Sequence, residues 1–109
     1  MSYGPTLPAV RYALRQKIVG LKDEIRAYFS NNMRIFLDSL TFIRPFSKGA
    51  IGCLKMSLFY ENRLVLLYVE LSQGLKPRWL TEDSMIEIAN IEGLRVLIDR
   101  WAEKHIVVF

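Results

Sequence analysis

The sequence predicts an α+β domain in which an antiparallel β-meander packs against helices. Three observations favour this fold class. Apolar residues recur at helical spacing near the N-terminus, successive β-like runs with short connections fill the middle, and helical spacing returns near the C-terminus. A chain of 109 residues, 51% of them hydrophobic, is long enough for one core and too short for two ordinary ones. We therefore expect a flexible leader over residues 1–7 and a single domain over residues 8–109.

The first predicted element is a long helix over residues 9–29. Apolar residues recur there every three or four positions, which is the spacing of one helix face. These residues are Val10, Leu14, Ile18, Leu21, Ile25 and Tyr28. Pro8 suits the first turn of such a helix, because a backbone N–H has no helical partner at that position. Polar turn residues at 30–32 are expected to end the helix.

Three β-like segments follow the first helix. Residues 33–43 are rich in Ile, Phe, Leu and Thr, which favours a strand. Residues 51–60 and 64–71 are two further apolar runs separated by residues 61–63, which predicts a β-hairpin. Lys55 and Ser57 alternate with apolar neighbours, so one face of the first arm is expected to be polar. Residues 64–69 are almost wholly apolar, which predicts a central strand covered on both faces.

The C-terminal part is predicted to be helical again. Residues 72–80 contain glycine and proline and are predicted to form a loop. Thr81 is expected to cap the next helix, with Glu82 and Asp83 in its first turn, where the helix dipole favours carboxylates. The apolar pattern then changes face, so a break near residues 90–93 predicts two consecutive helices. A short β-branched run at residues 105–109 is expected to form a final strand.

The positive charge of the chain is concentrated in its first half. Residues 1–50 carry eight Lys and Arg against three Asp and Glu, a balance of +5, whereas residues 51–109 carry seven against eight, a balance of −1. Four of these basic residues fall within about 60° on the first predicted helix, at 100° per residue. They are Arg11, Arg15, Lys22 and Arg26. A helix with one cationic flank favours a polyanionic partner, so the sequence predicts a nucleic-acid-binding surface there.

The expected mechanism is neutralisation of phosphates with release of counterions, which gives affinity with little sequence discrimination. Arg78 and Trp79 are further candidates for this surface, because a cation next to an aromatic ring suits a stacked base. Two alternatives stay open. The cationic flank is alternatively a solvated helix side whose aliphatic stems cover the rim of the core. Trp79 is alternatively an anchor of the core.

No motif in the sequence specifies catalysis or cofactor binding. The chain lacks a Walker-type phosphate loop and a dinucleotide-binding fingerprint. Cys53 and His105 are its only cysteine and histidine, which excludes a four-ligand zinc site of Cys and His within one chain. A nucleophile and base pair formed by these two residues is one interpretation. We favour a buried structural thiol and a surface histidine, and therefore a non-enzymatic protein with no catalytic residue, metal or cofactor.

The predicted order of a helix, three antiparallel strands, a helix and a further strand is similar to the core of the PD-(D/E)xK nucleases. In that family the third strand carries Glu-x-Lys, the second strand begins with Asp, and the first helix often offers a Glu. Glu70 and Glu24 match the strand and helix carboxylates. Ser72 stands in place of the lysine, and residues 49–53 contain no carboxylate. The resemblance implies a degenerate nuclease-like domain as an alternative function.

The same order also resembles the double-stranded-RNA-binding domain, whose last helix begins with lysines that grip phosphates. The corresponding residues here are Thr81, Glu82 and Asp83. Carboxylates at that position repel a phosphate backbone, so this resemblance does not extend to the family's contact residues.

Self-association is a further expectation. High apolar content and β segments at the predicted sheet edges, residues 33–43 and 106–109, favour a homodimer. A homo-oligomeric protein-interaction module without nucleic-acid affinity is therefore an alternative function. No stretch approaches the roughly 18 apolar residues of a membrane helix, so no membrane partner is expected. A single cysteine fits the reducing cytoplasm, where we expect the protein to reside.

Overall fold

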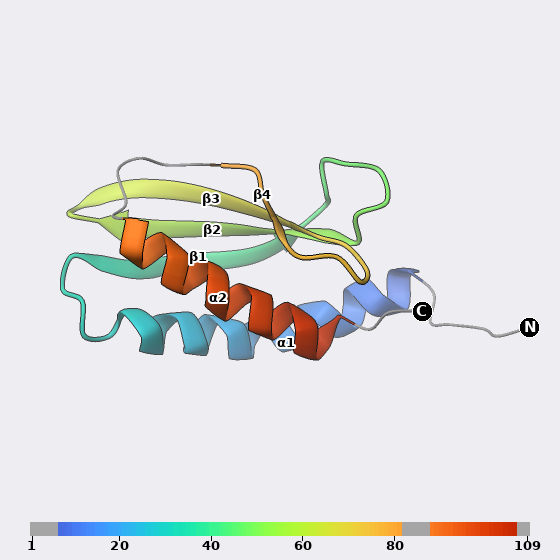
Figure 1. Cartoon of the computed structure of the whole chain (residues 1–109), viewed down its shortest axis with the longest axis horizontal. Helices are drawn as coiled ribbons and strands as arrows, with labels where there is room; N and C mark the ends of the chain where they lie inside the picture. The colour runs from blue at the N-terminus through green and yellow to red at the C-terminus, as the bar shows by residue number, and fades with distance from the viewer. Residues whose placement is uncertain (1–6, 82–87, 107–109) are drawn as a thin grey trace, which may run out of the picture.

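A computed structural model describes residues 7–81 and 88–106 of the chain. In these residues, both helices pack on one face of a four-stranded antiparallel sheet and run in opposite directions (Figure 1). The elements are α1 (Leu7–Phe29), β1 (Ile35–Ile43), β2 (Gly52–Tyr60), β3 (Arg63–Leu71), β4 (Arg78–Trp79) and α2 (Ile88–His105). The predicted α+β class is confirmed, with a helix before an antiparallel meander and a helix after it.

Helix α1 begins two residues before its predicted start, so Leu7 belongs to the helix and not to the leader. Residues 1–6 of the predicted leader lie outside the described residues. The buried face of α1 has the expected spacing and consists of Val10, Leu14, Ile18, Leu21, Ile25 and Phe29. Tyr28, predicted on this face, is 41% exposed. Phe29 takes its place because it stands four residues after Ile25.

The predicted hairpin forms with a shorter turn than expected. Arg63 already pairs with Tyr60, which leaves Glu61 and Asn62 as a two-residue turn with φ of 50° and 66°. Left-handed residues at both positions suit the right-handed twist of a hairpin. The Nε of Arg34 donates a hydrogen bond of 2.8 Å to the Glu61 carboxylate, and the Glu61 N–H donates one of 2.7 Å to the Arg34 carbonyl. These contacts join the turn to β1.

The two faces of the sheet differ, because both helices cover the same one. Val65 and Leu67 of β3 point to the helices and are buried, whereas Leu64 and Leu66 point away and are 56% and 36% exposed. The prediction that β3 is covered on both faces is therefore wrong. The predicted polar positions of β2 do lie on the face away from the helices. We call this the open face, and its residues in β1–β3 include Phe36, Ser39, Thr41, Lys55, Ser57, Phe59, Leu64, Leu66 and Tyr68.

The predicted loop over residues 72–80 contains a short fourth strand. Trp79 pairs with Val69 and Arg78 with Glu70, so β4 extends the sheet beyond β3. A strand of two residues has no periodicity from which it can be predicted. The pairing places β1 and β4 at opposite edges of the sheet.

The described part of α2 is one continuous helix, so the predicted break near residues 90–93 is wrong. Gly93 stands where α2 approaches α1, and a Cβ at this position would overlap the hydroxyl of Tyr28. The glycine therefore permits close helix packing and does not end a helix. His105 belongs to α2, which corrects the start of the predicted final strand. The predicted first helical turn with Glu82 and Asp83, and residues 107–109, lie outside the described residues.

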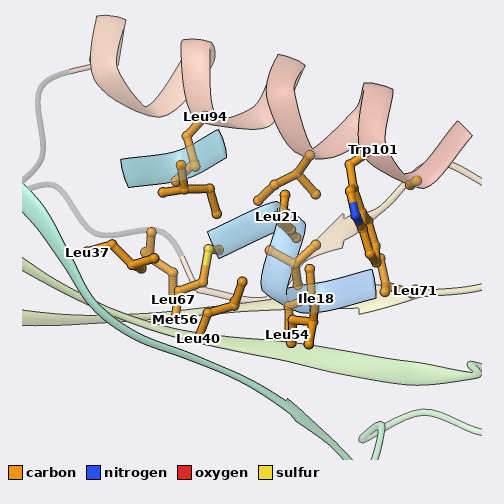
Figure 2. Packing of buried hydrophobic residues seen from close by; sticks show 14 of the residues in the cluster. Ile18, Leu21, Leu37, Leu40, Leu54, Met56, Leu67, Leu71, Leu94 and Trp101 are labelled. Atoms are coloured by element: carbon orange, nitrogen blue, oxygen red, sulfur yellow. The ribbon is translucent and has the colours of Figure 1, made fainter. Parts of the chain in front are cut away.

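The core lies between the two helices and the sheet. Its buried residues come from α1, α2 and the three long strands, with Ile51 and Ile106 next to these elements, and form one cluster. Figure 2 shows Trp101 projecting from α2 towards Leu71 of β3, beside Ile18 of α1. Neither helix in the described part of the chain is long and apolar enough to cross a membrane.

Candidate nucleic-acid interface

The four basic residues predicted on the first helix lie together along one flank of α1. We call Arg11, Arg15, Lys22 and Arg26 the cationic strip. They sit within about 60° around the helix axis, next to its buried face. Arg15 and Arg26 are exposed, whereas Arg11 and Lys22 are half-buried. From its first to its last residue the strip covers about 22 Å of helix, at 1.5 Å per residue.

The cationic strip lies beside β1, an edge strand of the sheet. The Nε of Arg11 donates a hydrogen bond of 2.7 Å to the carbonyl oxygen of Ile51. The guanidinium carbon of Arg15 lies 5.9 Å from the ring centroid of Phe42 in β1. Arg26 lines a hollow at the opposite end of β1. The strip therefore follows the sheet edge along most of its length, and its stems cover the rim of the core.

Within residues 7–81 and 88–106, no acidic side chain forms an ion pair with the cationic strip. Ion pairs lie elsewhere, as between Arg34 and Glu61 near the hairpin turn and between Arg95 and Glu92 on α2. The positive potentials of the four charges therefore add along the β1 edge, where they attract an anion.

The structure does not bring Arg78 and Trp79 to the cationic strip. Both lie in β4, at the sheet edge opposite to β1. Trp79 is partly buried and packs against the core, and the guanidinium carbon of Arg95 lies 5.4 Å from its ring centroid. Arg78 pairs in register with Glu70. Burial favours the interpretation of Trp79 as an anchor of the core.

Glu70 is 3% exposed and lies on the open face, because its neighbours Val69 and Leu71 point to the helices. Its carboxylate accepts hydrogen bonds of 2.7 Å from both the N–H and the hydroxyl of Ser47. Burial raises the pKa of Glu70, but hydrogen bonds from Ser47 and Phe46 and the charge of Arg78 outweigh burial and hold this pKa below its usual value. Glu70 is therefore an ionised anchor for the loop between β1 and β2.

Cys53 and His105 lie on opposite sides of the sheet and do not form a nucleophile and base pair. Cys53 pairs with Glu70 on the open face, whereas His105 ends α2 on the face covered by helices. Burial raises the pKa of the Cys53 thiol to about 11, and the charge of Glu70 adds to this effect. Burial and the charges of Lys17 and Lys104 lower the pKa of His105. The favoured interpretation of Cys53 as a buried structural thiol agrees with this geometry.

The carboxylates that match the nuclease pattern are also separated by the sheet. Glu24 lies in a groove between α1 and α2, whereas Glu70 lies on the open face. No group of three or more His, Cys, Asp and Glu residues in the described ranges could hold a metal ion. These two carboxylates therefore do not form the metal site that the nuclease resemblance implies.

The open face carries exposed apolar residues that sequence reasoning did not single out. Phe36 is 54% exposed and stacks on Phe59, with ring centroids 5.2 Å apart. Leu64 completes this row across the three strands. A signal was present in the sequence, because residues 64–69 are apolar at both odd and even positions, and a sheet covered by helices on one face leaves one of these two sets of side chains exposed.

No protein-family model, curated protein or solved structure matches this chain. Its function is therefore inferred from the residues and their arrangement.

Proposed function

We propose that this protein binds nucleic acid without catalysis, through the cationic strip on α1. One observation carries the proposal: four cations line a single helix flank, and none of them forms an ion pair with a described residue. Phosphates are the groups that such a row attracts, since their neutralisation releases condensed counterions. Cys53 lies beside Glu70, but His105 and Glu24 lie on the other side of the sheet, so neither a nucleophile and base pair nor a pair of metal-binding carboxylates forms among these residues.

Each member of the cationic strip has a defined part in this interaction. Arg15 and Arg26 are exposed and make the direct phosphate contacts, in which a guanidinium can donate two parallel hydrogen bonds. The bond from Arg11 to Ile51 restrains the Arg11 side chain in the unbound protein, so less side-chain entropy is lost on binding. Lys22 adds charge between them. Because all contacts go to the backbone, binding discriminates little between sequences.

The test is a titration of labelled duplex and single-stranded oligonucleotides, followed by fluorescence anisotropy at about 50 and 200 mM salt. The two direct phosphate contacts, from Arg15 and Arg26, predict that affinity for duplex falls about 12-fold between these two concentrations, and affinity for a single strand about 7-fold. A wild-type protein that binds neither oligonucleotide at the lower salt concentration refutes the proposal.

A pair of charge-matched variants locates the surface. The double variant Arg15→Glu with Arg26→Glu reverses the two exposed charges of the strip and is expected to abolish binding. The control, Lys17→Glu with Lys104→Glu, changes net charge equally, but both residues act on His105 at the helix-covered side. The control is expected to retain most of the affinity. An equal loss in both variants, with unchanged thermal unfolding, shows that net charge and not the strip controls binding.

A further inference from the structure

The open face of the sheet presents aromatic pairs at two places. Phe36 and Phe59 stack at the end nearest the hairpin turn, with ring planes 21° apart. Phe46, in the loop between β1 and β2, meets Tyr68 edge-on at the other end, with centroids 5.7 Å apart. Phe46 is 66% exposed, so each pair offers an accessible ring to a ligand.

Lys55 lies beside the pair of Phe46 and Tyr68. It stands four residues from Phe59 in β2, which is about 13 Å along a strand, and it pairs in register with Tyr68 of β3. Ser57 fills the intervening open-face position of β2. The open face thus combines the exposed apolar side chains of Phe36, Leu64 and Leu66 with the polar groups of Ser57 and Lys55, which differs from the continuous apolar surface of a stable dimer core.

Phe36 joins the open face to the cationic strip. Phe36 and Arg26 line the same hollow of about 320 Å³, together with the fully exposed Met33. A flat apolar group stacked on Phe36 therefore lies close to a guanidinium. This juxtaposition of a ring and a cation fits a nucleotide, whose base stacks while its phosphate pairs with the cation.

One argument from charge and one from base stacking decide what covers this face. A second copy packed on it by two-fold symmetry would bring the two Lys55 residues towards each other, in a chain of net charge +4. A polyanion meets no such repulsion. Duplex nucleic acid is also a poor occupant, because its bases are stacked on one another and offer no face to an aromatic ring.

We infer that the open face binds the unpaired bases of a single-stranded nucleic acid, while the cationic strip holds the strand's backbone. One base stacks on Phe36 and Phe59, another on Phe46 and Tyr68, and Lys55 contacts a phosphate between them. This inference rests on the proposed function and adds to it the class of ligand. Stacking tolerates every base, so the preference is for single strands and not for a sequence.

The test compares Phe36→Ala, Phe46→Ala and a control, Tyr28→Ala, in the anisotropy titration. Tyr28 is a partly exposed ring on the helix side, so its removal is a matched change away from the open face. Loss of one stacked base is expected to weaken single-strand binding about 5- to 150-fold. Duplex affinity and the salt dependence are expected to stay the same in both open-face variants, and the control is expected to bind as the wild type does.

The outcomes separate this inference from the proposed function. If neither oligonucleotide binds to wild type, the proposed function fails. If the strip variants lose binding while Phe36→Ala and Phe46→Ala bind single strands normally, the proposed function stands and this inference is wrong. Light scattering of the same samples supplies a further check. A wild-type dimer that Phe36→Ala converts to a monomer, with unchanged affinity for single strands, assigns the open face to a second copy and overturns the inference.

Discussion

Replacement of Glu70 by alanine is expected to destabilise the protein strongly. The carboxylate accepts two hydrogen bonds of 2.7 Å from Ser47 in a site that is 3% exposed. A hydrogen bond to a charged group contributes about 1.5–3 kcal/mol. Ser47 is half-buried, so water partly replaces the lost acceptor. We therefore expect a loss of about 2–4 kcal/mol in the free energy of unfolding, and release of the loop between β1 and β2.

Two milder variants separate charge from hydrogen bonding. Glu70→Gln keeps the shape of the side chain and an acceptor for the Ser47 N–H, so only the charge is lost, at a cost of about 1–2 kcal/mol. Ser47→Ala removes the hydroxyl bond and leaves the backbone bond in place, with a loss of about 1–2 kcal/mol. Because Glu70 and Ser47 are hydrogen-bond partners of each other, the double variant Glu70→Gln with Ser47→Ala should lose less stability than the sum of the two single losses.

The sign of the pH dependence follows from the lowered pKa of Glu70 in the folded protein. The unfolded chain has a carboxyl pKa of about 4.3, so the folded state binds protons less readily. The stabilisation is fully present above that value and is lost as the pH falls through the folded-state pKa. The difference in stability between the wild type and Glu70→Gln should therefore shrink in acid.

The assay is urea unfolding followed by circular dichroism at about pH 7 and about pH 3. The midpoint for Glu70→Ala should fall without a change in slope. Either of two results would refute the reasoning: an unchanged midpoint for Glu70→Ala, or a difference between the wild type and Glu70→Gln that is the same at both pH values.

Two further predictions concern the core. Gly93→Ala is expected to destabilise the wild type, because its Cβ overlaps the Tyr28 hydroxyl, but to stabilise a Tyr28→Ala background by about 1 kcal/mol through helix propensity. Urea unfolding measures both effects, and the same sign in both backgrounds contradicts the contact. Cys53 in the native protein is expected to resist alkylation by iodoacetamide at about pH 8, since burial keeps the thiol protonated. Mass spectrometry that shows rapid labelling without denaturant would contradict this.

Sequence reasoning predicted the elements whose evidence is local. The six buried residues of α1 repeat over about five turns, so one misplaced residue does not hide the helical pattern. β4 and the course of α2 depend on contacts between distant residues. A glycine is typical of a helix break, and only the close approach of Tyr28 in the structure shows that Gly93 is a packing position. The pairing of Trp79 with Val69 cannot be predicted from local sequence, because it forms only when the segment after β3 folds back against that strand.

The same division holds for the candidate interface. Arg11, Arg15, Lys22 and Arg26 lie on one helix, so helical geometry alone predicts that they share a flank. Arg78 comes from a segment whose position depends on the whole sheet, and the structure places it at the opposite edge. Glu70 matches the nuclease pattern by its position in the sequence, but its hydrogen-bond partner is Ser47, in the loop between β1 and β2. Its role could not be inferred without that loop.

The two-residue turn at Glu61 and Asn62 determines which side of β3 meets solvent. Residues 64–69 carry apolar or aromatic side chains on both faces, so a slip of one residue would still bury Leu64, Leu66 and Tyr68 against the helices. Hydrophobicity alone therefore specifies the alignment of this strand weakly. The left-handed turn and its bonds to Arg34 supply the missing information, because they admit one alignment only. An insertion at this turn would exchange the buried and exposed sides of β3 and would move Glu70 from its anchor into the core.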